Sequence, residues 1–92
     1  MQLRQPAWEL LTPCPVCDQP ALVLIACPGC GAVALRCAEE GSAFPSSTAL
    51  SADDAVPDET VCAACGRVPL SEFVNATAPQ ILAAGVAKGE YR

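Results

Sequence analysis

The sequence has no histidine, few aromatic residues and few basic ones. Without histidine the chain lacks the usual general base and open-site zinc ligand, and its serines stand in loop-like contexts without such a partner, so we expect no enzyme. One Trp, one Tyr and two Phe exclude a large aromatic core. A single domain, residues 1–92, buries little apolar surface, so something besides the core is expected to stabilise it.

Positive charge is also scarce, since the chain has five basic and ten acidic residues and its net charge is −5. The basic residues are not clustered, so phosphate backbones would be repelled and nucleic acid is disfavoured as a partner. The longest apolar stretch, residues 21–35, is broken by Pro28 and Gly29 and is too short for a membrane span. The N-terminal residues lack the pattern of a secretory signal. We therefore expect a soluble protein of the reducing cytoplasm, with no membrane partner.

Cysteine, by contrast, is abundant, with seven residues in the chain. Six of them form three C-x-x-C pairs and one stands alone: Cys14 with Cys17, Cys27 with Cys30, Cys62 with Cys65, and the single Cys37. This density is typical of a disulfide scaffold or a thiolate metal site. The odd number and the short spacing favour metal over disulfides. Redox dithiols need a helix directly after the pair, and the residues there predict turns and strands instead.

Short apolar runs predict a small β-rich domain. Residues 21–26 and 32–36 flank the CPGCG turn and are expected to form two antiparallel strands. A turn at Glu40-Gly41 and a third short strand around residues 43–44 complete a three-stranded sheet. Residues 45–59 are rich in Pro, Ser and Asp and predict a long acidic surface loop.

The two ends of the chain carry different signals. ATAPQILAAG predicts a short helix over residues 77–85, with Thr77 as N-cap, Gln80 as its capping-box partner and Gly85 as the stop. Its side chains Ile81 and Leu82 are expected to face inward. Residues 1–13 are expected to form an extended arm on the sheet, with Trp8 in the core.

Two pairings of the cysteines are open. In the first, the two pairs directly followed by glycine share one metal, because glycine permits the positive φ angle that a C-x-x-C turn, or knuckle, often needs. These ligands are Cys27, Cys30, Cys62 and Cys65. The competing pairing joins Cys14, Cys17, Cys27 and Cys30 in a very short ribbon.

The first pairing leaves three cysteines for a second site. A strand of six residues spans roughly 20 Å, so the knuckle before it and the knuckle after it lie at opposite ends. The turn after the second strand returns to the far end. Three thiolates and a fourth ligand, a carboxylate from Glu39 or Glu40 or a water, would complete this site. The cysteines are Cys14, Cys17 and Cys37.

The stretch from Cys27 to Phe73 resembles the rubredoxin-like zinc-ribbon class. CPGCG with the following apolar strand and EEG is similar to the first knuckle of that class, and VPDETVCAACG followed by SEF is similar to the second. The resemblance implies Cys27, Cys30, Cys62 and Cys65 as ligands, and in rubredoxins these hold one iron that carries single electrons. Ala32, Ala34 and Thr60 stand where rubredoxins have aromatic residues.

The first functional hypothesis is therefore a structural zinc module with one zinc, and a second zinc if the other three cysteines also bind. Metal binding would supply the folding energy that a small core cannot. Its expected task is contact with a protein partner that the sequence does not name. The alternative is a rubredoxin-type iron electron carrier.

Overall fold

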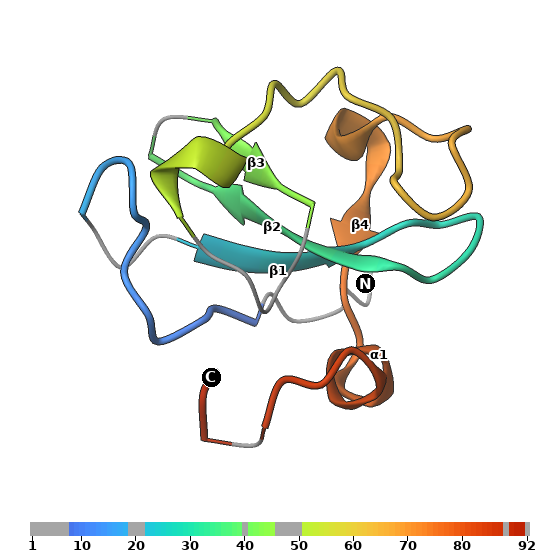
Figure 1. Ribbon diagram of the computed structural model, residues 1–92. Coiled ribbons are helices and arrows are strands. Elements are labelled where there is room, and N and C mark those ends of the chain that lie inside the picture. Colours follow the sequence, from blue (N-terminus) through green and yellow to red (C-terminus); the bar gives the residue numbers. More distant parts are fainter. Residues whose placement is uncertain (1–7, 19–21, 40, 46–50, 88, 92) are drawn as a thin grey trace, which may run out of the picture.

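The computed structural model describes residues 8–18, 22–39, 41–45, 51–87 and 89–91 (Figure 1). Its described elements are the strands β1 (Leu22–Ala26), β2 (Val33–Cys37), β3 (Ala43–Phe44) and β4 (Val74–Asn75), the 3-10 turns η1 (Ala52–Asp54) and η2 (Leu70–Glu72), and the helix α1 (Ala78–Ala83). The strands form one antiparallel sheet in the order β3-β2-β1-β4. The two predicted strands of the central hairpin and the third short strand are confirmed.

The hairpin of β1 and β2 is the centre of the molecule. Its register runs from the pair Leu22↔Cys37 at one end to the pair Ala26↔Val33 at the other, where Cys27 follows directly. β1 is apolar throughout because both of its faces are covered. Successive side chains of a strand point to opposite faces, so the hairpin contributes to two separate cores.

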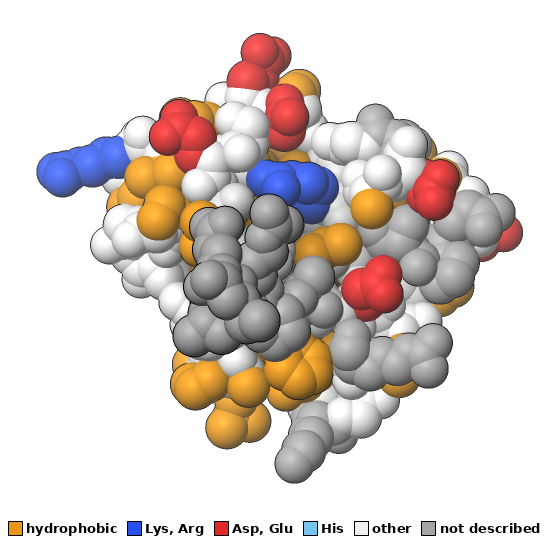
Figure 2. Space-filling model, turned by 180° about the vertical axis from the view of Figure 1, so that it is seen from behind, with side chains coloured by type: hydrophobic (Ala, Val, Ile, Leu, Met, Phe, Trp, Pro, Cys, Tyr) orange, Lys and Arg blue, Asp and Glu red, His pale blue; other side chains and the backbone are white. Residues whose placement is uncertain are grey.

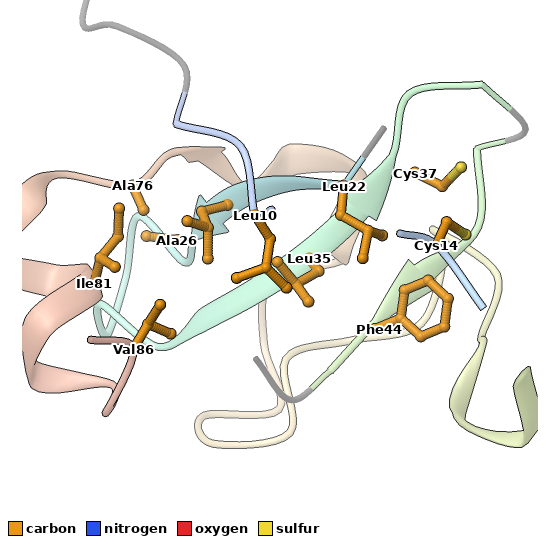
Figure 3. Close-up of a cluster of buried hydrophobic side chains, with 11 residues drawn as sticks. Leu10, Cys14, Leu22, Ala26, Leu35, Cys37, Phe44, Ala76, Ile81 and Val86 are labelled. Carbon is orange, nitrogen blue, oxygen red and sulfur yellow. The ribbon is translucent and has the colours of Figure 1, made fainter. Parts of the chain in front are cut away.

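The first core lies on one face of the hairpin and reaches from α1 to two cysteines at the opposite end (Figure 3). Its members are Leu10, Cys14, Leu22, Leu24, Ala26, Leu35, Cys37, Phe44, Ala76, Ile81 and Val86. The second core consists of Ile25, Cys27, Ala34, Ala43, Cys62, Leu70 and Phe73. Cysteines are members of both cores, so the packing of each core depends on the state of its thiols.

The fourth strand was not expected from the sequence. β4 pairs with the end of β1 through Ile25↔Asn75 and Ala26↔Val74. The same edge of β1 also carries the N-terminal arm, because the amides of Leu10 and Leu24 donate to Leu22 and Trp8 at 2.9 and 2.8 Å. A strand of two residues has no period to recognise, so only the pairing reveals it.

The helix α1 has the predicted N-terminal cap. The Gln80 amide donates to the Thr77 hydroxyl at 3.3 Å, and the Thr77 amide donates to the Gln80 side chain at 2.9 Å. Ile81 is fully buried, but Leu82 is 69% exposed, so the inward orientation expected of Leu82 is wrong. Neighbouring residues on a helix differ by about 100° in direction, and a helix this short presents only one face to the core. Within the described chain, no helix combines the length and apolar character needed to cross a membrane.

The arm and the acidic loop are described in part. Trp8 packs against the first core and meets the Tyr91 ring edge-on, with centroids 5.4 Å apart, as its expected core role requires. Residues 1–7 of the arm and 46–50 of the loop lie outside the described residues. The rest of the loop includes η1 and returns to the sheet, since the amides and carbonyls of Ala43 and Val56 pair at 2.8 and 3.0 Å.

Candidate metal centres

The seven cysteines form two groups at opposite ends of the β1–β2 hairpin. The four-cysteine group consists of Cys27, Cys30, Cys62 and Cys65, and the three-cysteine group of Cys14, Cys17 and Cys37. Within each group all sulfurs lie within 4.8 Å of one another, so each group could hold a metal ion. The structure thus gathers the cysteines as in the first of the two pairings, and the competing ribbon of the first two knuckles is not formed.

The sulfur spacing of the four-cysteine group fits a tetrahedral thiolate site. Zinc bound by four thiolates at about 2.3 Å places the sulfurs about 3.8 Å apart. The Cys27–Cys65 and Cys30–Cys62 sulfurs are separated by 3.8 and 3.6 Å. Both distances are far longer than the ~2.05 Å of a disulfide bond. The residues present therefore suit a metal ion of zinc size.

Each knuckle of this group is a tight turn closed by a backbone hydrogen bond. The amide of Gly31 donates to the Cys27 carbonyl and that of Gly66 to the Cys62 carbonyl, both at 2.8 Å. The two glycines have φ angles of +81° and +67°, in the left-handed region that glycine adopts at no steric cost. This is the conformation that the glycine after each pair predicted.

The elements around the group hold the two knuckles together. The first knuckle connects β1 to β2, and the Cys27 amide closes it by donating to the Ala32 carbonyl at 2.8 Å. The second is a small loop, closed by a 2.8 Å hydrogen bond from the Cys62 amide to the Val68 carbonyl. The Arg36 side chain on β2 donates to the carbonyl of Leu70, which follows this loop in the chain. The sheet therefore positions both knuckles.

Backbone amides also point at the sulfurs of Cys65 and Cys30, whose pKa values are shifted in opposite directions. The Arg67 amide, helped by the sulfurs of Cys27 and Cys62, outweighs desolvation and lowers the pKa of Cys65 to about 7. The Ala32 amide lowers the pKa of Cys30 as well, but desolvation and the three neighbouring sulfurs outweigh it and raise that pKa to about 12. Four thiolates this close repel one another, so a cation is needed to ionise them all.

The four-cysteine group lies at the surface on one side. Cys27 and Cys62 are buried in the second core, Cys65 is half-buried and Cys30 is exposed. Phe73 belongs to the same core, whereas the positions after the first knuckle are filled by Ala32 and Ala34. A metal here would be held from one side by a small core and be open to water on the other.

The three-cysteine group is more deeply buried. Cys14 and Cys37 are fully buried in the first core, beside Leu22 and Phe44 (Figure 3), and Cys17 is half-buried. The sulfurs of Cys17 and Cys37 are 3.4 Å apart. Cys14 follows directly after the arm, and Cys37 is the last residue of β2.

The knuckle formed by Cys14 and Cys17 has the same turn although no glycine follows it. Asp18 has a φ of +60°, and its amide donates to the Cys14 carbonyl at 2.8 Å. Aspartate is among the few residues other than glycine that adopt the left-handed region readily. The lack of a following glycine therefore does not distinguish this turn from the other two knuckles. The grouping of cysteines that the glycines suggested is nevertheless the one found.

Carboxylates are absent from both groups as far as the chain is described. Glu39 is exposed and does not join the three sulfurs, and Glu40 lies outside the described residues. The described acidic residues of the loop, among them Asp53, Asp54 and Asp58, form no further group of three or more ligand side chains. The groups of three or more ligand side chains in the described chain thus consist of cysteines.

Searches against protein-family models, curated proteins and solved structures found no match. The two groups therefore have to be interpreted from their own geometry.

Proposed function

We propose that this protein is a non-catalytic zinc module of the rubredoxin-like zinc-ribbon type, with zinc bound by Cys27, Cys30, Cys62 and Cys65. The observation that carries the proposal is the spacing of these four sulfurs on two closed knuckles, since it fits a tetrahedral zinc site without a position left for water. A closed site of this kind stabilises a fold and offers no metal-bound water for catalysis.

The two small cores support a structural role for the metal. Each contains a single buried phenylalanine among smaller apolar residues, and each includes two buried cysteines. A chain of 92 residues buries a modest share of its surface, and structural zinc supplies folding energy directly. Thiolates bind metal only while they stay reduced, which supports a location in the cytoplasm.

Contact with another protein is the task that best suits such a module. Figure 2 shows basic side chains standing apart and among acidic ones over the described part of one face, so this face has no continuous positive surface for nucleic acid. Val74 on β4 and Leu82 on α1 are more than half exposed. A partner that covered these side chains would remove their apolar area from water, which favours binding.

The test is metal analysis of protein purified without added metal, combined with an absorption spectrum. We expect zinc and no visible colour. The same four thiolates would hold iron in an electron carrier, so iron with visible thiolate absorption would replace the zinc module by that function. Protein that stays folded while binding neither metal would contradict both.

A further inference from the structure

The three-cysteine group brings together two segments that lie far apart in the sequence. Cys14 and Cys17 follow the N-terminal arm, whereas Cys37 ends β2. All three sulfurs lie within 4.8 Å of one another, and those of Cys17 and Cys37 are 3.4 Å apart. The fold therefore places thiols from the N-terminal segment and from the sheet at one point.

The backbone holds Cys37 in the same way as Cys27 of the four-cysteine group. The Cys37 amide donates to the Ser42 carbonyl at 2.8 Å, and its carbonyl accepts from the Gly41 amide at 2.9 Å. Cys27 forms the same two hydrogen bonds, with the residues five and four positions later, both at 2.8 Å. The knuckle on the other side of the group is closed by the Asp18 amide. Because the backbone already positions these sulfurs, little ordering is needed when an ion binds.

The surroundings of the group favour a thiophilic ion. Cys14 and Cys37 are fully buried beside Leu22 and Phe44 (Figure 3), and the described residues contribute only sulfur to the group. Thiolates select soft ions such as zinc, whereas Mg²⁺ and Ca²⁺ take oxygen ligands. Three protein ligands are enough to hold zinc, since catalytic zinc sites have three. Zinc therefore suits the three described sulfurs.

The arm that precedes Cys14 is paired with the edge of β1. The Leu10 amide donates to the Leu22 carbonyl at 2.9 Å. The Leu24 amide donates to the Trp8 carbonyl at 2.8 Å. The ends of a domain are well ordered only where something ties them down. A metal that linked Cys14 to the end of β2 would tie the arm to the sheet at a second place.

Residues 89–91, near the C-terminus, contact the arm in turn. The Leu11 amide donates to the Glu90 carbonyl at 2.8 Å. The Trp8 and Tyr91 rings meet edge-on with centroids 5.4 Å apart. Trp8 is the only tryptophan of the chain, so its emission reports on this contact.

We propose that Cys14, Cys17 and Cys37 bind a second zinc ion through their thiolates, and that this ion fastens the arm and residues 89–91 to the sheet. The thiolate chemistry is that of the proposed zinc module, but the ion acts on the first core and on both chain ends. Because the two sites share no residue, the second can be absent while the zinc module stands.

The test counts the zinc ions bound by the full chain. The unaltered chain is expected to bind two. Cys17→Ser, which removes a half-buried sulfur, should lower the affinity for one of them by at least tenfold, because losing even a residue that orients a ligand costs about 10–100-fold. Val16→Ser is the matched control on the same knuckle, and this exposed position should leave both ions in place.

Trp8 emission shows whether the second ion fastens the arm. In Cys17→Ser with its remaining ion bound, the emission should shift to longer wavelength and acrylamide should quench it more strongly, because the ring becomes exposed to water. Val16→Ser should match the unaltered chain. Circular dichroism checks that Cys17→Ser keeps its sheet. If this variant folds poorly, two ions in the unaltered chain still establish the site, since the four-cysteine group holds one.

The outcomes separate the second site from the zinc module. A single ion that Cys17→Ser leaves in place would overturn the second site and leave the module intact. A single ion that Cys17→Ser loses would support this site and contradict the module. Two ions in the unaltered chain, with Trp8 quenching unchanged in Cys17→Ser, would overturn the role of the ion at the arm. No bound zinc at all would overturn both.

Discussion

Asp18 holds the backbone conformation that glycine holds in the other knuckles, with a φ of +60°. Its amide closes the turn onto Cys14, so the position of both cysteines in this knuckle depends on it. A glycine is recognised in a sequence at once, but an aspartate in the same role is not, because aspartate is also common in ordinary turns. The left-handed conformation at this position therefore could not be predicted from the residue type, although the backbone of the structure shows it.

The change in stability on substitution of Asp18 should depend on how well the new residue adopts the left-handed backbone conformation, and not on its charge. Asp18→Gly should keep or slightly raise stability, whereas Asp18→Val should lower it by about 1–2 kcal/mol, because a β-branched residue is strained in the left-handed region. Urea denaturation of the metal-loaded protein measures both. Asp18→Asn is the control for charge, and an equal loss in Asn and Val would show that the carboxylate matters instead.

Among the regular elements, the central hairpin and the helix cap could be predicted from sequence, and the edge of the sheet could not. Runs of Val, Leu and Ile on both sides of a knuckle define β1 and β2, and the Thr77 cap defines the start of α1. β4 joins β1 through two residue pairs, and so short a strand leaves no local pattern in the sequence. The separation of the cysteines into two groups was predicted from the glycine after two of the knuckles and from strand length, because a rigid strand keeps its ends apart.

The orientation of α1 gives a direct test at the scale of the element. Ile81→Ala should destabilise the protein by about 2–5 kcal/mol, since it removes a fully buried side chain from the first core. Leu82→Ala, one residue later, should change stability by less than about 0.5 kcal/mol because Leu82 is mostly exposed. Thermal denaturation compares the two, and similar losses would mean that the helix is rotated from the orientation described.

For the molecule as a whole, the metal is expected to decide whether the chain folds. Structural zinc sites contribute about 10–16 kcal/mol in small zinc-binding peptides. The total stability of a domain is about 5–15 kcal/mol. Removing a metal bound to the four-cysteine group would therefore withdraw as much free energy as a small domain has in total.

Cys62→Ser should accordingly lose the metal of the four-cysteine group and lower the melting temperature strongly, with loss of the β signal in circular dichroism. Ala63→Ser places the same hydroxyl on the next residue, which is exposed, and should leave both properties unchanged. A strong chelator should have the effect of Cys62→Ser on the unaltered protein. Retention of the fold after chelation would show that the two cores suffice without metal.

The hairpin of β1 and β2 is fixed by a cysteine group at each end, with Cys27 just beyond one end and Cys37 at the other. A shift of one residue between two strands would turn every side chain of the shifted strand to the opposite face. With both ends anchored, any shift would have to pull a ligand out of its group. Metal bound in both groups would therefore fix the alignment of the two strands, and amide exchange in this hairpin would then require release of metal before the strands can separate.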